Sequence, residues 1–76
     1  MMEAAKVLDA KGLACPMPVV RTKKAMDELH SGEVLEVHVT DKGAMNDMPA
    51  WAKASGHELI EQTEDGAVQK FWIKKN

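Results

Sequence analysis

The sequence predicts an α/β two-layer sandwich: a mixed four-stranded sheet with two helices on one face. Two segments carry apolar residues at helical spacing, and four short segments have the composition and alternation of strands. Their order along the chain is β-α-β-α-β-β. The first crossover should be right-handed, which makes the first two strands parallel.

Size and charge narrow the class of protein. The 76 residues make one domain, 1–76, and a chain this short buries only about 60% of the surface that it exposes when unfolded. One cysteine cannot form an internal disulfide, so the apolar core must hold the fold.

A net charge of −2 argues against direct nucleic-acid binding. No apolar run is long enough to span a bilayer and the N-terminus does not resemble a signal peptide, so we expect a cytoplasmic protein without membrane insertion.

The first half of the chain reads as strand, helix, strand. We expect a strand at Val7–Ala10, a break at Lys11–Gly12, and a helix with Cys15 as N-cap and Pro16 at its first position. This helix should end at Ser31–Gly32. Its buried face is predicted to carry Val19, Thr22, Ala25, Met26 and Leu29.

The strand that follows, Val34–Thr40, alternates between a buried and an open face. Its buried residues, together with two from the last strand, should face the helices: Leu35, Val37, Val39, Phe71 and Ile73. The open face should carry Glu36, His38, Thr40 and Trp72.

A second helix should begin between Ala44 and Asp47, with Asp47 more suited to a cap than to catalysis. Pro49 is predicted in the first turn, because an interior proline costs about 3 kcal/mol. Gly56 should follow the helix end, and the core positions should be Met45, Met48 and Ala52. Two strands, Glu58–Thr63 and Ala67–Lys74, should form a hairpin around Glu64-Asp65-Gly66.

The chemistry must centre on Cys15, the only cysteine. The loop before it and the segment Asp41–Asp47 should meet where two parallel strands end, the edge at which open α/β sheets bind ligands. A thiol at a helix N-terminus is favoured as thiolate. Three basic residues follow Cys15 on the predicted helix: Arg21, Lys23 and Lys24. They form either a docking face for an acidic partner protein or an ordinary solvated helix face.

Other thiol chemistries fit less well. A CxxC oxidoreductase is excluded because there is no second cysteine. A Cys-His hydrolase would need a base, but all three histidines are expected away from Cys15: His30, His38 and His57. No metal-ligand spacing is present, so we expect neither metal nor cofactor. A lone cysteine is often an inert core residue, but flanking prolines at a loop-helix junction favour a functional thiol.

Cys15-Pro16-Met17-Pro18, preceded by Leu8–Leu13, resembles the Cys-Pro-x-Pro motif of the TusA/SirA/YeeD-type sulfur carriers. Asp41-x-Gly43 with Asp47–Trp51 resembles the second block of that family, although Lys42 stands where proline is common. The resemblance implies a fold like the C-terminal domain of translation initiation factor three.

The resemblance also implies that Cys15 accepts sulfane sulfur as a persulfide and passes it to another protein. The donor would be a cysteine desulfurase, a rhodanese or a transporter-linked protein, and the pathway tRNA thiolation, molybdenum-cofactor supply, sulfur oxidation or thiosulfate uptake. We expect a monomer that binds a donor and an acceptor protein in turn. The supporting positions are Gly12, Pro16, Met17, Pro18 and Asp47, and the partner-binding positions are Arg21, Lys23, Lys24 and Lys42.

Two alternatives remain open at this point. One is a thiol redox sensor, in which Cys15 would form a stable sulfenate or an intermolecular disulfide. The other is a regulatory or nucleic-acid-binding module on the same fold, which the net charge disfavours.

Overall fold

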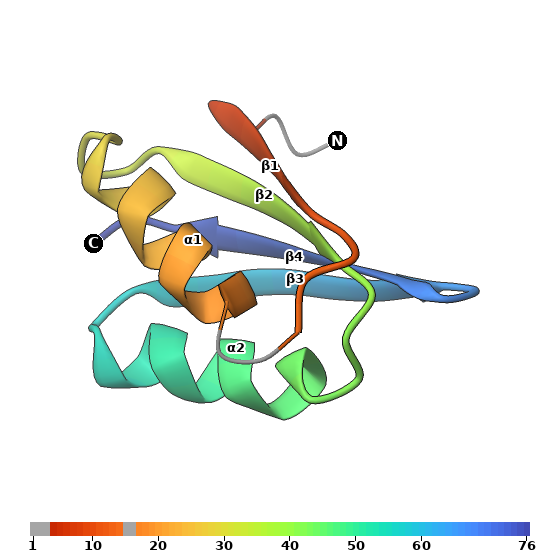
Figure 1. The fold of residues 1–76 in the computed structure, drawn as a ribbon. Coiled ribbons are helices and arrows are strands. Elements are labelled where there is room, and N and C mark those ends of the chain that lie inside the picture. The colour runs from red at the N-terminus through yellow and green to blue at the C-terminus, as the bar shows by residue number, and fades with distance from the viewer. Residues whose placement is uncertain (1–3, 15–16) are drawn as a thin grey trace.

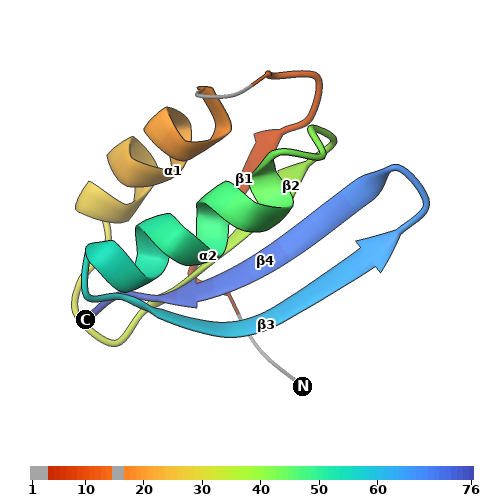
Figure 2. The same cartoon turned by 90° about the horizontal axis from the view of Figure 1, so that it is seen from below.

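The computed structural model describes residues 4–14 and 17–76 and has the predicted two layers (Figure 1). Its elements are β1 (Lys6–Ala10), α1 (Met17–Asp27), β2 (Val34–Val39), α2 (Ala44–Ala54), β3 (Glu58–Asp65) and β4 (Val68–Lys74). The sheet order is β1-β2-β4-β3. Figure 2 shows both helices on the same face of the sheet, with α1 toward β1 and α2 toward β3.

Strand directions decide which loops share an edge. β1 pairs with β2 in parallel, as predicted, and β4 pairs antiparallel with both β2 and β3. The carboxyl ends of β1 and β2 therefore lie at one edge of the sheet. β4 begins at that same edge, because Gln69 near its start pairs with Val39 at the end of β2.

The core lies between the sheet and the helices. The five predicted inward-facing strand residues are completely buried: Leu35, Val37, Val39, Phe71 and Ile73. From α1, Met26 and Ala25 join them, and Thr22 is buried with its hydroxyl donating to the Pro18 carbonyl at 2.7 Å. That hydrogen bond lets a polar side chain sit in an apolar layer without an unpaired hydroxyl.

The opposite sheet face carries a small polar cluster. Trp72 Nε1 donates to Glu36 Oε1 at 3.0 Å, and His38 Nε2 forms a short contact with Glu36 Oε2. The hydrogen bond from His38 is the main cause that holds the pKa of Glu36 below its usual value of 4.5, and the bond from Trp72 acts in the same direction. The prediction that Glu36, His38 and Trp72 share this face is confirmed.

The predicted end of the first helix is wrong. α1 ends at Asp27, and the chain continues with two tighter i→i−3 bonds, from Glu28 N to Ala25 O and from Leu29 N to Met26 O. The helix ends early because the next backbone amide, on His30, donates to the Glu33 side chain at 2.6 Å instead. Leu29 still reaches the core from this turn.

Three predictions about the second helix are also wrong. α2 starts at Ala44 with Gly43 as N-cap, so Asp47 lies in the first turn and is not the cap. Pro49 is the sixth helical residue and lies inside α2, because the helix starts earlier than a proline in the first turn would require. Met45 is 36% exposed, whereas Met48 and Ala52 are buried as predicted.

The end of α2 confirms the predicted role of Gly56. Its φ of 80° is in the left-handed region, where glycine carries no Cβ penalty. Gly56 N donates to Lys53 O and His57 N to Ala52 O, which is the bond pair of a Schellman motif. The chain then enters β3, which with β4 forms a hairpin joined at Gly66–Ala67, so β3 runs two residues further than predicted.

Candidate functional site

The loops after β1 and β2 are joined by one hydrogen bond. Gly12 N donates to Thr40 Oγ1 at 2.9 Å across 28 positions of sequence. Gly12 has a φ of 82°, so the chain turns sharply directly after β1. The structure thus brings the predicted support residue Gly12 to the segment that follows β2, as expected from the parallel pairing.

Thr40 is a residue that the sequence interpretation missed in this role. It was expected on the open sheet face, but its hydroxyl oxygen instead receives the amide of the other loop. A threonine directly after a parallel strand is a weak signal for such a tie, because many strands end in threonine for other reasons.

The β2–α2 loop, residues 40–43, brings two carboxylates close to one glycine. A Cβ placed on Gly43 would lie 3.2 Å from Asp41 Oδ2 and 3.8 Å from Asp47 Oδ2. Asp47 therefore points back from the first turn of α2 toward its N-cap, where the helix dipole favours negative charge. This acidic group and the loop after β1 occupy the same edge of the sheet.

Cys15 and Pro16 lie outside the described residues, so the predicted N-cap and first helical position stay predictions. Their neighbours are described. Met17 N donates to Ala14 O at 2.9 Å, Ala14 is exposed, and Met17 is 38% exposed. Pro18 is buried in the core. The residues on both sides of Cys15-Pro16 are therefore exposed. Pro18, the second residue of α1, anchors the start of that helix in the core.

The predicted partner-binding bases do not form one face. Arg21 and Lys24 line a shallow groove between α1 and β1, and Lys6 of β1 lies in the same groove. Lys6 Nζ pairs with Glu28 Oε2 at 2.5 Å, and this hydrogen bond and charge lower the pKa of Glu28. Lys23 is exposed elsewhere on α1, and Lys42 is exposed in the β2–α2 loop.

The three histidines occupy separate places. His30 follows α1, and His38 belongs to the cluster on the open sheet face. His57 packs against Trp51, with ring centroids 5.5 Å apart, and its Nδ1 accepts from the Asn76 amide at 3.2 Å. These two partners hold His57 at the carboxyl end of α2, the end opposite to the β2–α2 loop.

Within residues 4–14 and 17–76, no three potential His, Cys, Asp or Glu ligands gather closely enough to hold a metal ion. Nor does any helix in that described part have the length and apolar character needed to cross a membrane.

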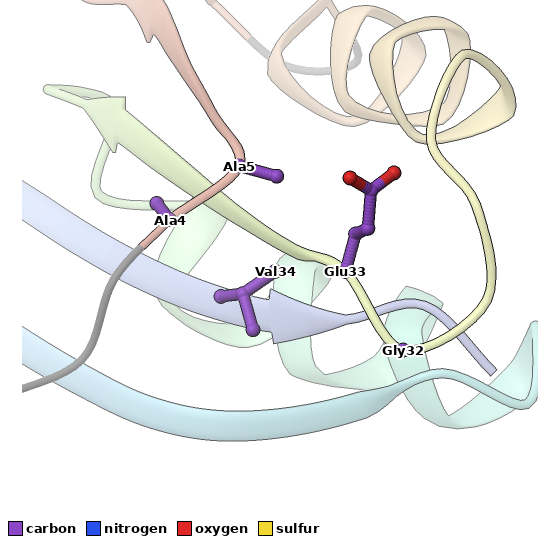
Figure 3. A pocket seen from close by; sticks show the side chains of 5 residues that line it. All are labelled: Ala4, Ala5, Gly32, Glu33 and Val34. Carbon is purple, nitrogen blue, oxygen red and sulfur yellow. The ribbon is translucent and has the colours of Figure 1, made fainter.

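A surface hollow lies at the other end of the sheet, and Figure 3 shows it from close by. It is lined by Ala4, Ala5, Gly32, Glu33 and Val34, which surround the start of β1 and the turn before β2. Only Glu33 carries a charge there, and its carboxylate already accepts from His30 N. This hollow is therefore not part of the candidate site.

The fold and the sequence together define a class: a small α/β module whose only cysteine lies two residues before its first helix in the sequence, with the loop after β1 tied to the segment that follows the parallel strand β2. The family model described as "Sulfurtransferase TusA" matches residues 6–75. The chain belongs to this TusA family.

Individual relatives agree with this assignment. YrkI of Bacillus subtilis is 69% identical over 97% of this chain and 99% of its own length. The sulfur carrier protein TusA of Allochromatium vinosum is 48% identical, covering 91% of each chain. The crystal structure of a SirA-like protein from Desulfitobacterium hafniense superposes with a TM-score of 0.80 at 32% identity, covering 91% of this chain and 95% of that one.

Proposed function

We propose that this protein is a sulfur carrier that holds sulfane sulfur as a persulfide on Cys15. The observation that carries the proposal is the family match over residues 6–75 of a chain with only one cysteine. Relatives in the family are named sulfur carrier proteins.

The proposed chemistry needs one nucleophile and two protein partners. The Cys15 thiolate attacks the terminal sulfur of a donor persulfide. The donor's S–S bond breaks as the new one forms, and the donor leaves as a thiolate. Transfer of the sulfur to the acceptor repeats this step with Cys15 as the leaving group. A nucleophile of the acceptor attacks the terminal sulfur, and Cys15 leaves as a thiolate. No net oxidation or reduction occurs in either step.

Several features of the described residues support this chemistry. Ala14 and Met17, which flank Cys15-Pro16 in the sequence, are exposed, as the proposed approach of a partner protein requires. Pro18 and Thr22 anchor the first turns of α1 in the core, so the helix that follows Cys15 in the sequence has a fixed position on the sheet. The lack of a second cysteine means that the chain cannot discharge its own persulfide as an internal disulfide.

Docking of the donor and acceptor proteins is part of the proposal. Arg21 and Lys24 lie along α1, which begins two residues after Cys15. They share their groove with the paired residues Lys6 and Glu28. Lys42 is exposed in the β2–α2 loop and adds a positive charge at the edge of the sheet where β1 and β2 end. We propose that these residues attract acidic partner surfaces, and that the carrier works as a monomer in a reducing cytoplasm. Salt should therefore slow transfer by screening the attraction.

A two-stage sulfur-transfer assay, with loading followed by delivery to an acceptor protein, tests the proposed function. The protein is loaded from a sulfane donor, desalted, and mixed with an acceptor protein whose thiol gains the sulfur. We expect wild type to deliver sulfur and Cys15→Ser to deliver none. If Cys15 instead reacts with peroxide at low dose and never takes sulfur, the protein is a redox sensor and the proposal is wrong.

A further inference from the structure

β1 is an edge strand whose outer side is open to another chain. In the sheet that the described residues form, β1 has β2 as its only neighbour (Figure 1). An edge strand leaves the N–H and C=O groups of alternate residues pointing away from the sheet. An extended segment of another chain can pair with such groups and become an additional strand.

The opposite edge of the sheet is protected by negative charge. Four of the eight residues of β3 are exposed acids: Glu58, Glu61, Glu64 and Asp65. Charges along an edge strand oppose pairing with a further strand. β1 has only two charged residues, Lys6 and Asp9, which are of opposite sign, and its Val7 is 56% exposed. β1 is therefore the edge that is better suited to pairing.

The groove between β1 and α1 lies beside this open edge. Its lining residues are Lys6, Leu8, Arg21, Lys24, Ala25 and Glu28. None of the described residues of β2 lines it, so the groove opens on the outer side of β1, where Figure 2 shows α1. Lys6 and Glu28 pair with each other, whereas Arg21 and Lys24 are exposed and belong to no ion pair among the described residues. The groove therefore offers two positive charges to a ligand.

The alternation of side chains along β1 determines which residues would suit an added strand. Lys6 and Leu8 face the helices, as their neighbours on β2 do, whereas Val7 and Asp9 face the open side of the sheet. Side chains on the helix-facing side of an added strand would lie in the groove near the exposed bases of α1, which favour carboxylates. Side chains on its other side would lie beside the exposed Val7 and the negative Asp9, which favour uncharged apolar residues.

We propose that the outer edge of β1, with the groove beside α1, binds an extended segment of a partner protein as a fifth strand of the sheet. In this segment acidic residues alternate with apolar ones. The segment is assigned to a sulfur donor or acceptor protein, and in that respect the inference rests on the proposed carrier function. Backbone pairing supplies affinity, and the alternating side chains supply selectivity.

A second copy of this chain fits the edge less well. Its acidic strand β3 carries acids on both faces, because Glu61 pairs with Trp72 of the open face and Glu64 pairs with the buried Gln69. Some of these acids would therefore meet Asp9. Pairing of β3 with β1 of the next copy is also head-to-tail, and such contacts extend into open-ended assemblies unless they close into a ring.

Synthetic peptides test the inference on the unloaded chain, so that no sulfur chemistry enters the measurement. The probe is a peptide of about eight residues, within the usual length of a strand, in which glutamate alternates with valine. Calorimetric titration should detect its binding. Replacing the glutamates with glutamine should weaken binding by about tenfold, the factor expected for two exposed ion pairs. With saturating peptide, amide hydrogen exchange should slow at alternate residues of β1 and stay unchanged in β3.

Methylation of the peptide backbone separates strand pairing from charge attraction alone. Two further peptides carry N-methyl groups either on all the glutamates or on all the valines. Only one side of an added strand pairs with β1, so one of these peptides should lose binding and the other should keep it. Equal binding of the two methylated peptides, or slowed exchange in β3 instead of β1, would overturn the inference.

Single charge removals test the groove itself. Arg21→Gln and Lys24→Gln should each weaken binding of the glutamate peptide by about threefold. The matched control is Lys53→Gln, which removes an exposed base from the last turn of α2 and should bind like wild type. Equal losses in all three variants would show a general effect of charge and would overturn the inference.

Two further outcomes distinguish the occupant and the function. If the chain without peptide forms large assemblies that Arg21→Gln disperses, the edge belongs to a second copy and the inference is wrong. Uptake of sulfane sulfur is measured separately. A chain that takes up sulfur but binds no peptide overturns the inference alone, whereas one that binds the peptide but takes up no sulfur refutes the carrier function and leaves β1 as a peptide-binding edge.

Discussion

The hydroxyl of Thr40 shows how one side chain can order a site made of two loops. It receives the amide of Gly12 and so joins two segments that the chain separates by 28 residues. Neither loop has regular structure of its own, and each must be held by such contacts. Thr40 therefore orders this edge of the sheet without having a part in the sulfur chemistry proposed for Cys15.

At Cys15 itself, chemistry and folding should be separable. The sequence predicts Cys15 at an exposed helix start, where a side chain contributes little packing, so Cys15→Ala should change the free energy of unfolding by no more than about 0.5 kcal/mol. Urea denaturation followed by circular dichroism measures this. A loss of several kcal/mol would instead identify Cys15 as a core residue and would remove the basis for a carrier.

On the open sheet face, Glu36 should contribute stability that depends on pH. Its pKa is lowered in the folded state, chiefly by the hydrogen bond from His38, so its stabilising effect is present above the ordinary value of 4.5 and is lost as pH falls through the folded pKa. Glu36→Gln should therefore cost about 1 kcal/mol near neutral pH and much less in acid.

Glu61→Gln is the control for this measurement, because Glu61 is exposed on β3 and pairs with Trp72 in the same sheet. Thermal melts of the three chains across acidic and neutral pH give the comparison. A gap between wild type and Glu36→Gln that stays constant with pH would contradict the assignment.

Among the elements, the two helices differ in how well their ends could be predicted. Gly56 was predictable, because a glycine after an apolar helical pattern is the usual C′ residue. The end of α1 was not, because it depends on a contact from Glu33 to the His30 amide. The position of Pro49 was missed because the helix propensity of proline disfavours an interior position. The packing of Ala44 and Met48 on the core extends α2 on the N-terminal side of Pro49.

The end of α2 offers a direct test at this scale. Gly56→Ala puts a Cβ on a residue with φ of 80° and should cost about 1–2 kcal/mol. Space is not the cause, since the nearest atom to that Cβ would be Asn76 Nδ2 at an ordinary 3.6 Å. Ser55→Ala, one residue earlier in a right-handed conformation, should be nearly neutral in the same urea titration. Equal losses in both variants would refute the backbone argument.

For the molecule as a whole, strand alternation was enough to predict both layers, because the five residues of β2 and β4 that were predicted to face inward are completely buried. The groove between α1 and β1 could not be predicted in this way. It combines Lys6 with Arg21 and Lys24 through the docking of a helix on an edge strand, which is a long-range arrangement. The buried Oε1 of Gln69, which accepts no hydrogen bond among the described residues, is likewise visible only in three dimensions.

The core is small, so single truncations should be severe. Phe71 is fully buried, and Phe71→Ala should cost about 3–5 kcal/mol, which is a large part of the stability of a small domain. Phe71→Leu keeps most of the volume and should lose less than about 1.5 kcal/mol. Circular dichroism melts should show a large loss for the first variant and a cooperative, mildly lowered transition for the second. Similar melting of Phe71→Ala and wild type would mean that the core lies elsewhere.

The central claim, that Cys15 carries sulfur, is tested most directly by intact-protein mass spectrometry after incubation with a sulfane donor. We predict a mass increase of about 32 Da, one sulfur atom, on wild type that a reductant removes as the persulfide is reduced. Cys15→Ser, treated in parallel, should keep its original mass. Wild type that remains unmodified with desulfurase, polysulfide and thiosulfate donors alike, or an equal adduct on Cys15→Ser, would contradict the claim.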